Sequence, residues 1–415
     1  MMRACVTCAA LVVSGAIVGA EPPAVSPDPK SLVVASEDAL KARELVQKLG
    51  SEDYLDREQA EHDLAAMGRL ARAALLDGVN LDPDPEVRAR CRCLLPKASA
   101  DEIKARLDSF MADTDGKYDH DLPGWQKLRS TVRGEWKMFG WTFAARSNAD
   151  KAARALFIEF FEAPGGRQLL TALNGPPQEL AHLVATRRTE LYNARFPRVG
   201  GVATRNPSVA EVGVVLFAES HAPTPNGPRQ MPISSVLQTS GIPALVRGAD
   251  DRAMAMRAVL TEWFETRTDP LDMYQAMTLA TTMHNDTVAE RLAVRVMTAP
   301  GLQGFYKGQA LATLVRVKAV DRLPMIEKSF TDTAVLTTTI KIVNGMQVRE
   351  SIEVRDAALA AALVMTGQNP DEYGFEGFPK NGGTGVNFIY TQAKIPDDKR
   401  KGALEKWKAW REKNP

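Results

Sequence analysis

A short pattern recurs along this chain and points to packed α-helices. An arginine is followed by a small residue three positions later and by an apolar residue at the seventh position. On a helix the small and apolar residues share one face, so a neighbouring helix can approach closely there, while the arginine at the edge can bind a carboxylate or a carbonyl. The pattern occurs as Arg57-Ala60-Leu64, Arg88-Cys91-Leu95, Arg252-Ala255-Val259 and Arg355-Ala358-Ala362. The distance along the chain between the first two copies fits one helix pair per repeat.

The first two copies lie in a stretch with clear helix boundaries. Apolar spacing predicts a helix over Asp53–Met67, with Gly68 at its C-terminal cap. A second helix is expected over Leu70–Leu76, ending near Gly78. Pro83-Asp84-Pro85-Glu86 predicts the start of a third, over Glu86–Leu95, because proline and acidic residues suit a first helical turn.

The stretch Leu49–Leu95 resembles a HEAT repeat, the antiparallel helix pair of α-solenoids. It is similar to the secreted HEAT-type proteins of planctomycete-type bacteria, a family of unassigned function. Three further stretches fit the resemblance, namely Asp121–Ser130, Val354–Phe375 and Lys406–Arg411. The resemblance implies a helical-repeat fold and carries no catalytic residue over to this chain.

The pattern is lost between Leu122 and Gly248, although helices are still expected there. Apolar faces predict helices over Asp150–Phe161 and Gln178–Ala194, separated by loops rich in proline and glycine. Regular helices return over Arg252–Phe330, with expected breaks at Asp269-Pro270, Pro300-Gly301 and Pro324.

One late segment predicts strands instead of helices. The β-branched runs Val335–Val343 and Met346–Val354 flank Asn344-Gly345, a strong signal for a two-residue hairpin turn. We expect Ile340 and Ile342 to face Met346 and Val348. The hairpin either covers the end of the helical array or offers an edge to an extended partner peptide.

The first twenty residues are typical of a secretory signal peptide. Arg3 is followed by the apolar stretch Ala9–Val18 and by small residues before Ala20. The alternative, a membrane anchor, is less well matched because the apolar stretch is short and contains polar residues and glycines. Glu21–Pro29 follows as a proline-rich, extended tether.

Cleavage after Ala20 balances the charge and removes half of the cysteines. The full chain has 52 Lys+Arg and 51 Asp+Glu, and Arg3 is lost with the signal peptide. A balanced total gives no reason to expect nucleic acid as a partner. Of the four cysteines, Cys91 and Cys93 remain. Because they lie two positions apart on one predicted helix, their side chains point in different directions. We expect them to be packing residues, and the alternative is a redox role.

Candidate catalytic and metal-binding motifs are weak throughout. The five histidines are far apart and none lies in an HExxH pattern; no serine lies in GxSxG or SxxK. The glycine-rich stretch Gly374–Gly385 fits no nucleotide-binding motif and predicts a loop before the last helix. We therefore assign no catalytic, cofactor-binding or metal residue and expect no cofactor.

Two clusters suggest chemistry but have simpler explanations. Asp113–Asp121 alternates acids around Gly116 like a calcium loop, yet Met111 and Leu122 occupy the outer ligand positions, so a solvated acidic linker is expected. The second cluster is aromatic and consists of Trp125, Trp136, Phe139, Trp141 and Phe143. These rings could stack on sugar rings, although a hydrophobic anchor is the preferred interpretation.

At the C-terminus, Leu404, Trp407 and Trp410 are expected to seal the last repeat.

These observations predict an all-α, HEAT-like solenoid with irregular central helices and one late β-hairpin. The expected parts are a signal peptide (1–20), a tether (21–35), N-terminal repeats (36–112), an irregular helical region (113–250) and C-terminal repeats (251–415) with a hairpin at about 335–354 and a capping helix. The predicted function is an exported, periplasmic or extracellular, non-enzymatic scaffold or protein-interaction protein without a membrane span after cleavage. The alternatives are a cell-envelope hydrolase with dispersed catalytic residues and an envelope carbohydrate-binding protein.

Overall fold

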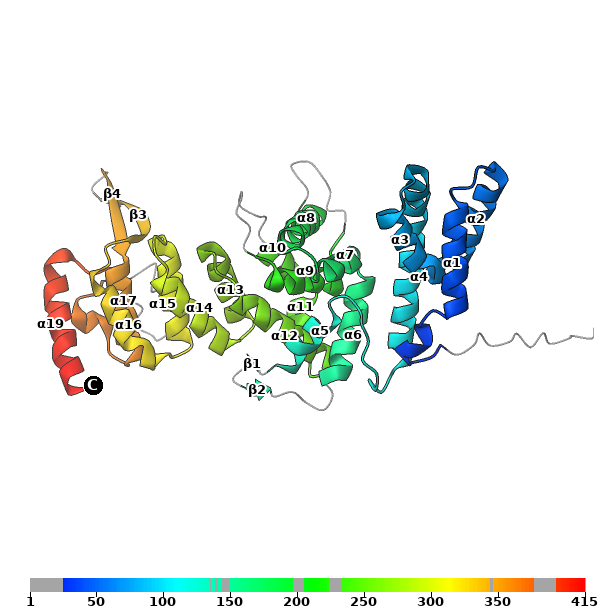
Figure 1. Ribbon diagram of the computed structural model, residues 1–415. Coiled ribbons are helices and arrows are strands. Elements are labelled where there is room, and N and C mark those ends of the chain that lie inside the picture. Colours follow the sequence, from blue (N-terminus) through cyan, green and yellow to red (C-terminus); the bar gives the residue numbers. More distant parts are fainter. Residues whose placement is uncertain are drawn as a thin grey trace, which may run out of the picture. The chain divides into compact units, whose positions relative to one another are not determined.

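The computed structural model describes residues 25–134, 136–138, 141–143, 149–196, 205–223, 233–343, 346–376 and 393–414. These residues are mostly helical, so the expected helical class is confirmed (Figure 1). The chain forms two compact units, residues 1–122 and 123–415. The expected signal peptide lies outside the described residues.

Unit 1 consists of two helix pairs. Helix α1 packs on α2 and α3 packs on α4, while α1 also contacts α3 and α2 contacts α4. The helices and 3-10 turns are η1 (Pro29–Leu32), α1 (Ser36–Lys48), α2 (Tyr54–Met67), η2 (Gly68–Ala71), α3 (Arg72–Leu81) and α4 (Pro85–Ala112).

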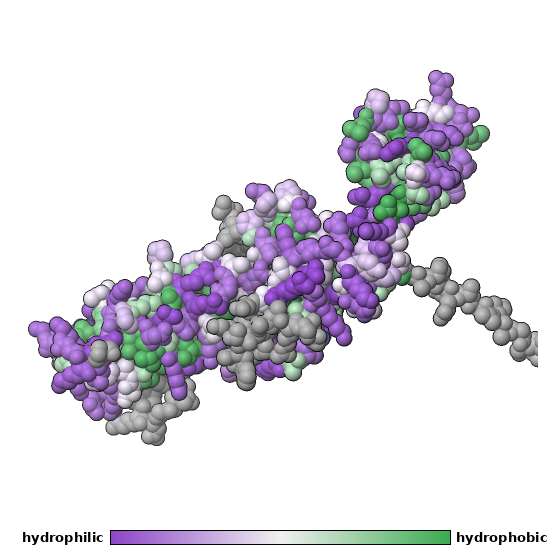
Figure 2. Space-filling view, turned by 60° about the horizontal axis from the view of Figure 1, so that its bottom comes forward, coloured by the Kyte–Doolittle hydropathy of each residue, from purple (hydrophilic) through white to green (hydrophobic). Residues whose placement is uncertain are grey.

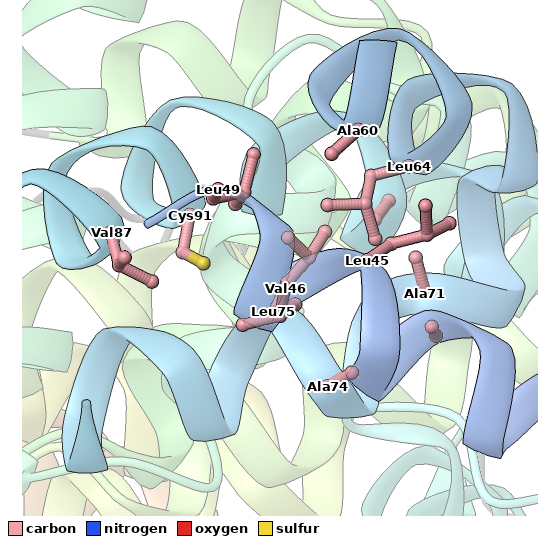
Figure 3. Packing of buried hydrophobic residues seen from close by; sticks show 12 residues of the cluster. Leu45, Val46, Leu49, Ala60, Leu64, Ala71, Ala74, Leu75, Val87 and Cys91 are labelled. Carbon is pink, nitrogen blue, oxygen red and sulfur yellow. The ribbon is translucent and has the colours of Figure 1, made fainter. Parts of the chain in front are cut away.

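The core of unit 1 contains small and apolar side chains from all four helices. Figure 3 shows Leu45 and Val46 of α1, and Leu49 directly after it, lying between the side chains of α2, α3 and α4. The small and apolar residues of the recurring pattern belong to this core, since Ala60, Leu64 and Cys91 are buried. Burying such side chains is the main favourable contribution to folding.

Two helix ends in unit 1 differ from prediction. Helix α3 passes through Gly78 to Leu81, because the missing side chain of Gly78 lets the helix lie against Cys91; a Cβ there would come within 2.7 Å of its Sγ. Helix α4 continues past Pro96 to Ala112 instead of ending at Leu95. Its later turns bury Leu107 and Phe110, and this packing outweighs the backbone hydrogen bond that Pro96 cannot donate. The helix over Asp53–Met67 is confirmed, with Asp53 as N-cap and Gly68 as C-cap.

Unit 2 begins with a group of helices in which α12 is central. Helix α12 packs on α5, α6 and α9, and α9 also contacts α7 and α8. The predicted helices over 150–161 and 178–194 are confirmed as α6 and α8. The elements are α5 (Trp125–Arg133), β1 (Trp136–Met138), β2 (Trp141–Phe143), α6 (Ala149–Glu162), α7 (Gly166–Ala172), α8 (Pro177–Arg195), α9 (Val209–His221), α10 (Ile233–Thr239), α11 (Ile242–Leu245) and α12 (Asp251–Glu265).

The rest of unit 2 is a row of neighbouring helices. Figure 1 shows α13, α14 and α15 next to one another, and α15 in turn packs on α17. The breaks expected before Pro270 and at Pro300-Gly301 are confirmed, whereas Pro324 lies in the first turn of a helix and does not end one. The elements are α13 (Pro270–Thr282), α14 (Asp286–Thr298), α15 (Gly304–Arg316), η3 (Val320–Arg322), α16 (Leu323–Glu327), η4 (Lys328–Thr331), β3 (Val335–Val343), β4 (Met346–Glu353), α17 (Val354–Met365), η5 (Pro370–Tyr373) and α19 (Asp397–Lys413).

The late hairpin is confirmed, but its faces are not those expected. Strands β3 and β4 are antiparallel, and Ile342 pairs with Gln347. Because directly opposed positions share a face, Met346 and Val348 fall on the opposite face from Ile340 and Ile342. The Asn344-Gly345 turn lies outside the described residues.

A second hairpin was not predicted. Strands β1 and β2 pair Trp136 with Phe143 and Met138 with Trp141. This stretch was interpreted only as an aromatic cluster, although its alternation of aromatic and polar residues has the two-residue period of a strand. The described residues are therefore mostly helical, with two small antiparallel sheets.

Candidate functional site

The most concentrated group of buried charges lies between helices of unit 2, around Glu219 of α9. Its Oε1 accepts a hydrogen bond from Arg188 of α8 and lies 3.1 Å from Arg267 Nη1, and its Oε2 accepts one from Trp263 Nε1 at 2.8 Å. All four side chains are buried. We call Arg188, Glu219, Trp263 and Arg267 the buried ion cluster.

Backbone contacts complete this cluster. Arg267 donates from Nε to the carbonyl of Trp263 at 3.0 Å and from Nη2 to the carbonyl of Glu219 at 3.1 Å. Arg295 of α14 donates to the carbonyls of Glu265 and Arg267. Burial lowers the pKa of Arg267, although the charge of Glu219 opposes this change. The neighbouring Asp272 of α13 has a raised pKa because burial disfavours its carboxylate.

The space beside the buried ion cluster is small. A cavity of about 30 Å³ lies against Glu219, Arg267 and Asp272. That volume has room for a water molecule and is far below the size of a typical substrate pocket. The cluster therefore joins α8, α9, α12 and the loop after α12, and it offers no room for a substrate.

The expectation of a solvated acidic linker is confirmed for Asp115, Asp119 and Asp121, which are exposed, but it is wrong for Asp113, whose side chain is buried. Its oxygens accept hydrogen bonds from the backbone N–H groups of Lys117 at 2.9 Å and Tyr118 at 3.1 Å. The second oxygen also lies 3.1 Å from Nε2 of His120, which is buried as well. The ring of His120 packs edge-on against Phe110. Asp113 thus closes the loop after α4.

A cleft of about 330 Å³ opens beside this loop in unit 1. Part of its wall is the apolar segment that follows η1, and part is charged. It is lined by Pro29, Leu32, Val33, Val34, Glu102, Arg106, His120, Asp121 and Leu122.

The last helix only partly seals the end of unit 2. Trp407 is 3 % exposed, and its Nε1 donates to Glu327 at 3.1 Å. The ring of Trp410 packs against that of Trp407 in a tilted arrangement, with centroids 5.2 Å apart. Leu404, however, lines an open groove of about 610 Å³ together with Phe330 and Trp407. Figure 2 shows hydrophobic residues near the C-terminal end on the face it draws, between hydrophilic ones.

The tryptophans proposed for sugar stacking give no exposed platform where they are described. Trp125 is buried against Phe157, at 5.5 Å between ring centroids, and Arg129 and Arg154 lie near its ring. Trp125 is therefore a buried residue of unit 2 and offers no stacking surface. The side chains of Trp136, Phe139, Trp141 and Phe143 lie outside the described residues.

The sequence interpretation missed a different aromatic group. Tyr274 of α13 and Phe305 and Tyr306 of α15 form a cluster with centroid distances of 4.9 to 6.0 Å. Phe305 is 40 % exposed, and the two tyrosines are half-buried. The adjacent aromatic pair at 305–306, directly after a glycine, is the only sequence signal for it. We call these three residues the surface aromatic cluster.

The two cysteines point in different directions, as expected. Cys91 is buried in the core of unit 1 and Cys93 is exposed, and both are free thiols. Burial raises the pKa of Cys91 to about 11, so its thiol stays protonated near neutral pH.

The histidines lie on separate elements. His62 and His182 are exposed on α2 and α8, His221 ends α9 and His284 follows α13. Within the described ranges, no three His, Cys, Asp or Glu side chains are placed to hold a metal ion. Every described helix is too short or too polar to serve as a membrane-spanning segment.

Comparisons with family models, with curated proteins and with solved structures found no match to this chain.

Proposed function

We propose that this chain is an exported, non-enzymatic helical-repeat protein that binds another protein through the surface of its repeats. The proposal includes the HEAT-like solenoid architecture and membership of the secreted HEAT-type proteins. Three kinds of observation support it: a repeated helix start in unit 1, a repeated helix end in unit 2 and an exposed aromatic cluster.

The repeated helix start is shared by α2 and α4. In each, an aspartate N-cap, Asp53 or Asp84, accepts a hydrogen bond at 2.8 Å from the backbone N–H two residues later. In each, an arginine four residues after the cap reaches back to two carbonyls of the preceding turn. Arg57 binds those of Ser51 and Glu52, and Arg88 binds those of Asp82 and Pro83. The same set of contacts at the start of the second helix in each of two successive helix pairs favours a structural repeat.

The repeated helix end is shared by α13, α15 and α17. After each, one residue adopts the left-handed conformation, namely His284, Lys318 or Gly367. The next residue then donates its N–H to a carbonyl five positions back, which is the pattern of a Schellman cap. Helices α13 and α15, which begin at Pro270 and Gly304, also have equal length.

The hairpin interrupts this second repeat. The left-handed residues after α15 and α17, Lys318 and Gly367, are farther apart along the chain than His284 and Lys318, because β3 and β4 lie between them. An insertion of this kind leaves a repeat array intact and adds surface to one side of it. Figure 1 shows the hairpin extending from α15 and α17.

The surface aromatic cluster is the single observation that carries the binding function. Aromatic side chains are enriched at protein interfaces, where one exposed ring can contribute much of the binding energy. Phe305 follows Gly304, which lies directly against the backbone of Val335 at the base of β3. Val335 is itself 49 % exposed, so the hairpin base enlarges the apolar surface beside the cluster.

Export rests on the sequence of residues 1–35. A cleaved signal peptide would place the mature chain in the periplasm or outside the cell. Mass spectrometry of the native protein tests this part alone: a mature chain beginning at Glu21 supports export, and a chain beginning at Met1 contradicts it.

Affinity capture from the envelope fraction tests the binding function. The mature chain is compared with Phe305→Ser and with Val320→Ser, a similarly exposed residue (46 %) just beyond the other end of α15. We expect one protein to be captured by the wild type and by Val320→Ser, with roughly tenfold lower recovery by Phe305→Ser. If the wild type captures nothing beyond a tag-only control, the proposed function is wrong.

A further inference from the structure

The open groove of about 610 Å³ beside α19 has an apolar lining. Leu404 and Trp407 contribute to it from α19, and Phe330 contributes from η4. The rings of Phe330 and Trp407 meet edge-on, with centroids 6.1 Å apart. Trp407 is buried, whereas Phe330 and Leu404 are only half-buried. Covering the groove with another helix would remove this apolar surface from water, which is favourable.

Next to the groove, α19 carries a stripe of alternating charge. Its members are spaced by four, three and four residues and therefore share one face of the helix; they are Lys401, Glu405, Lys408 and Glu412. All four side chains are exposed, and Lys401 Nζ and Glu405 Oε1 are 4.0 Å apart. Lys408 and Glu412, which line the groove, form no ion pair with any residue that the structure describes. We call these four residues the charge stripe.

The charge stripe is complementary to itself when two copies of α19 lie antiparallel. In that arrangement positions 401 and 412 can lie side by side, and positions 405 and 408 then do so as well. Lys401 meets Glu412 of the second copy, and Lys408 meets Glu405 of the second copy. Two-fold symmetry repeats both pairs. A parallel arrangement would place equal charges against each other, so the stripe favours the antiparallel one.

The residues on either side of the charge stripe leave room for a second helix. On the side away from the groove lie Gly402 and Ala409. Ala409 is exposed, and a Cβ added at Gly402 would have no atom within 4 Å. Small residues of this kind let two helix axes approach to about 8 Å. On the other side, a helix at that distance covers Leu404 and the groove.

We propose that the charge stripe and the adjacent groove form the interface of a symmetric dimer of this chain, with the two α19 helices antiparallel. Exposed ion pairs contribute little individually and are weakened by salt, so the dimer dissociates when the salt concentration is raised. The surface aromatic cluster lies on α13 and α15 instead. The dimer is therefore a property beyond the proposed function and does not depend on it.

Sedimentation velocity of the purified full chain tests the dimer with charge reversals. Lys408→Glu brings a carboxylate against Glu405 of the second copy, and Glu405→Lys brings an ammonium group against Lys408. Each is expected to raise the Kd of the dimer at least about tenfold, because the like charges meet twice in a symmetric pair. Lys413→Glu, also exposed on α19 but outside the charge stripe, is the matched control and should leave the Kd unchanged. Tryptophan fluorescence checks that each variant is folded.

Mixing the two reversed variants distinguishes this pairing from any other contact. A heterodimer of Lys408→Glu with Glu405→Lys regains both ion pairs between positions 405 and 408. The mixture is therefore expected to dimerise almost as tightly as the wild type, although neither variant does so alone. A wild type that stays monomeric overturns the proposal and leaves the groove to a different occupant. A mixture that dimerises no better than its components also overturns it. Since only the purified chain is present, these outcomes are independent of export and of any captured protein.

Discussion

In unit 1 the helices meet through small and apolar side chains, whereas in unit 2 three helices and a loop meet around a buried carboxylate. The arginines of unit 1, Arg57 and Arg88, bind backbone carbonyls at the edge of the packing. The arginines of unit 2, Arg188 and Arg267, are themselves buried and share Glu219. The same residue type therefore closes helix turns in one unit and joins helices in the other.

This difference predicts unequal responses to mutation. A partly exposed arginine that binds carbonyls contributes one or two charge-assisted hydrogen bonds. Removing one member of a buried ion cluster leaves the other charges without their partner in a medium of low polarity, which costs far more. Tryptophan fluorescence separates the two units experimentally, because all six tryptophans of the chain lie in unit 2.

The largest effect is expected for Glu219→Ala. The substitution removes the acceptor shared by Arg188, Arg267 and Trp263, and the free energy of unfolding of unit 2 should fall by about 3–5 kcal/mol. Denaturant titration followed by tryptophan fluorescence measures it. The control is Glu262→Ala on α12, a partly exposed carboxylate expected to cost at most about 1 kcal/mol. Equal losses in both variants would show that the buried ion cluster does not hold unit 2 together.

A smaller effect, confined to unit 1, is expected for Arg88→Ala. Loss of its hydrogen bonds to the carbonyls of Asp82 and Pro83 should cost about 1.5 kcal/mol, measured by hydrogen exchange of α4 amides. Arg57→Ala should behave alike, because its contacts are equivalent. Arg92→Ala, exposed on the same helix, is the matched control and should have little effect. A shift in the tryptophan transition would contradict the assignment of this effect to unit 1.

The repeated helix ends predict stabilising substitutions in unit 2. His284 and Lys318 are exposed and left-handed, a conformation that costs non-glycine residues about 1 kcal/mol or more. His284→Gly and Lys318→Gly should therefore each stabilise unit 2 by about 1 kcal/mol. Gly367→Ala should destabilise unit 2 by a similar amount. A Cβ at this position would meet no other atom, so the cost comes only from the left-handed backbone conformation. Differential scanning calorimetry measures the three changes, and a destabilised His284→Gly would contradict the shared helix end.

The smallest effect is a pH dependence of unit 2 through His221. Burial lowers the pKa of His221; Glu262 opposes this shift and Lys127 adds to it. An unfolded histidine titrates near pH 6.5, so the unfolded state takes up a proton before the folded state does. The stability that unit 2 has above pH 6.5 is therefore partly lost as the pH falls from about 6.5 towards the pKa of His221 in the folded protein. Unfolding midpoints at pH 7.5 and 5.5 should differ less in His221→Phe than in the wild type, whereas His182→Phe, an exposed control, should retain the full difference.

Local patterns were enough to predict the individual elements. The spacing of apolar residues located α2, α6 and α8, and the β-branched runs around Asn344-Gly345 located the late hairpin. These features depend on neighbours in the sequence. The extension of α4 past Pro96 was not predictable in this way, because it depends on the burial of Leu107 and Phe110 by the rest of unit 1.

The buried charges could not be predicted, since their partners are far apart in the sequence. Nothing next to Glu219 indicates that Arg188 and Arg267 will bind it. Asp113 was misinterpreted for the same reason: a cluster of acids suggested solvent exposure, whereas backbone N–H groups and His120 bury one of them. The prediction of which residues share a face of the late hairpin was wrong, because the strands pair one position away from the expected alignment.

Cross-linking mass spectrometry in the native envelope fraction tests most directly whether unit 2 presents a protein-binding surface. Lys307 neighbours the surface aromatic cluster, while Lys41 and Lys48 lie on α1 of unit 1. We predict that one protein is repeatedly cross-linked to Lys307, and that Phe305→Ser abolishes these links but leaves those within the chain unchanged. Two results would contradict a binding surface at the aromatic cluster. One is that no other protein is cross-linked to the chain, and the other is that the cross-links are spread equally over Lys41, Lys48 and Lys307.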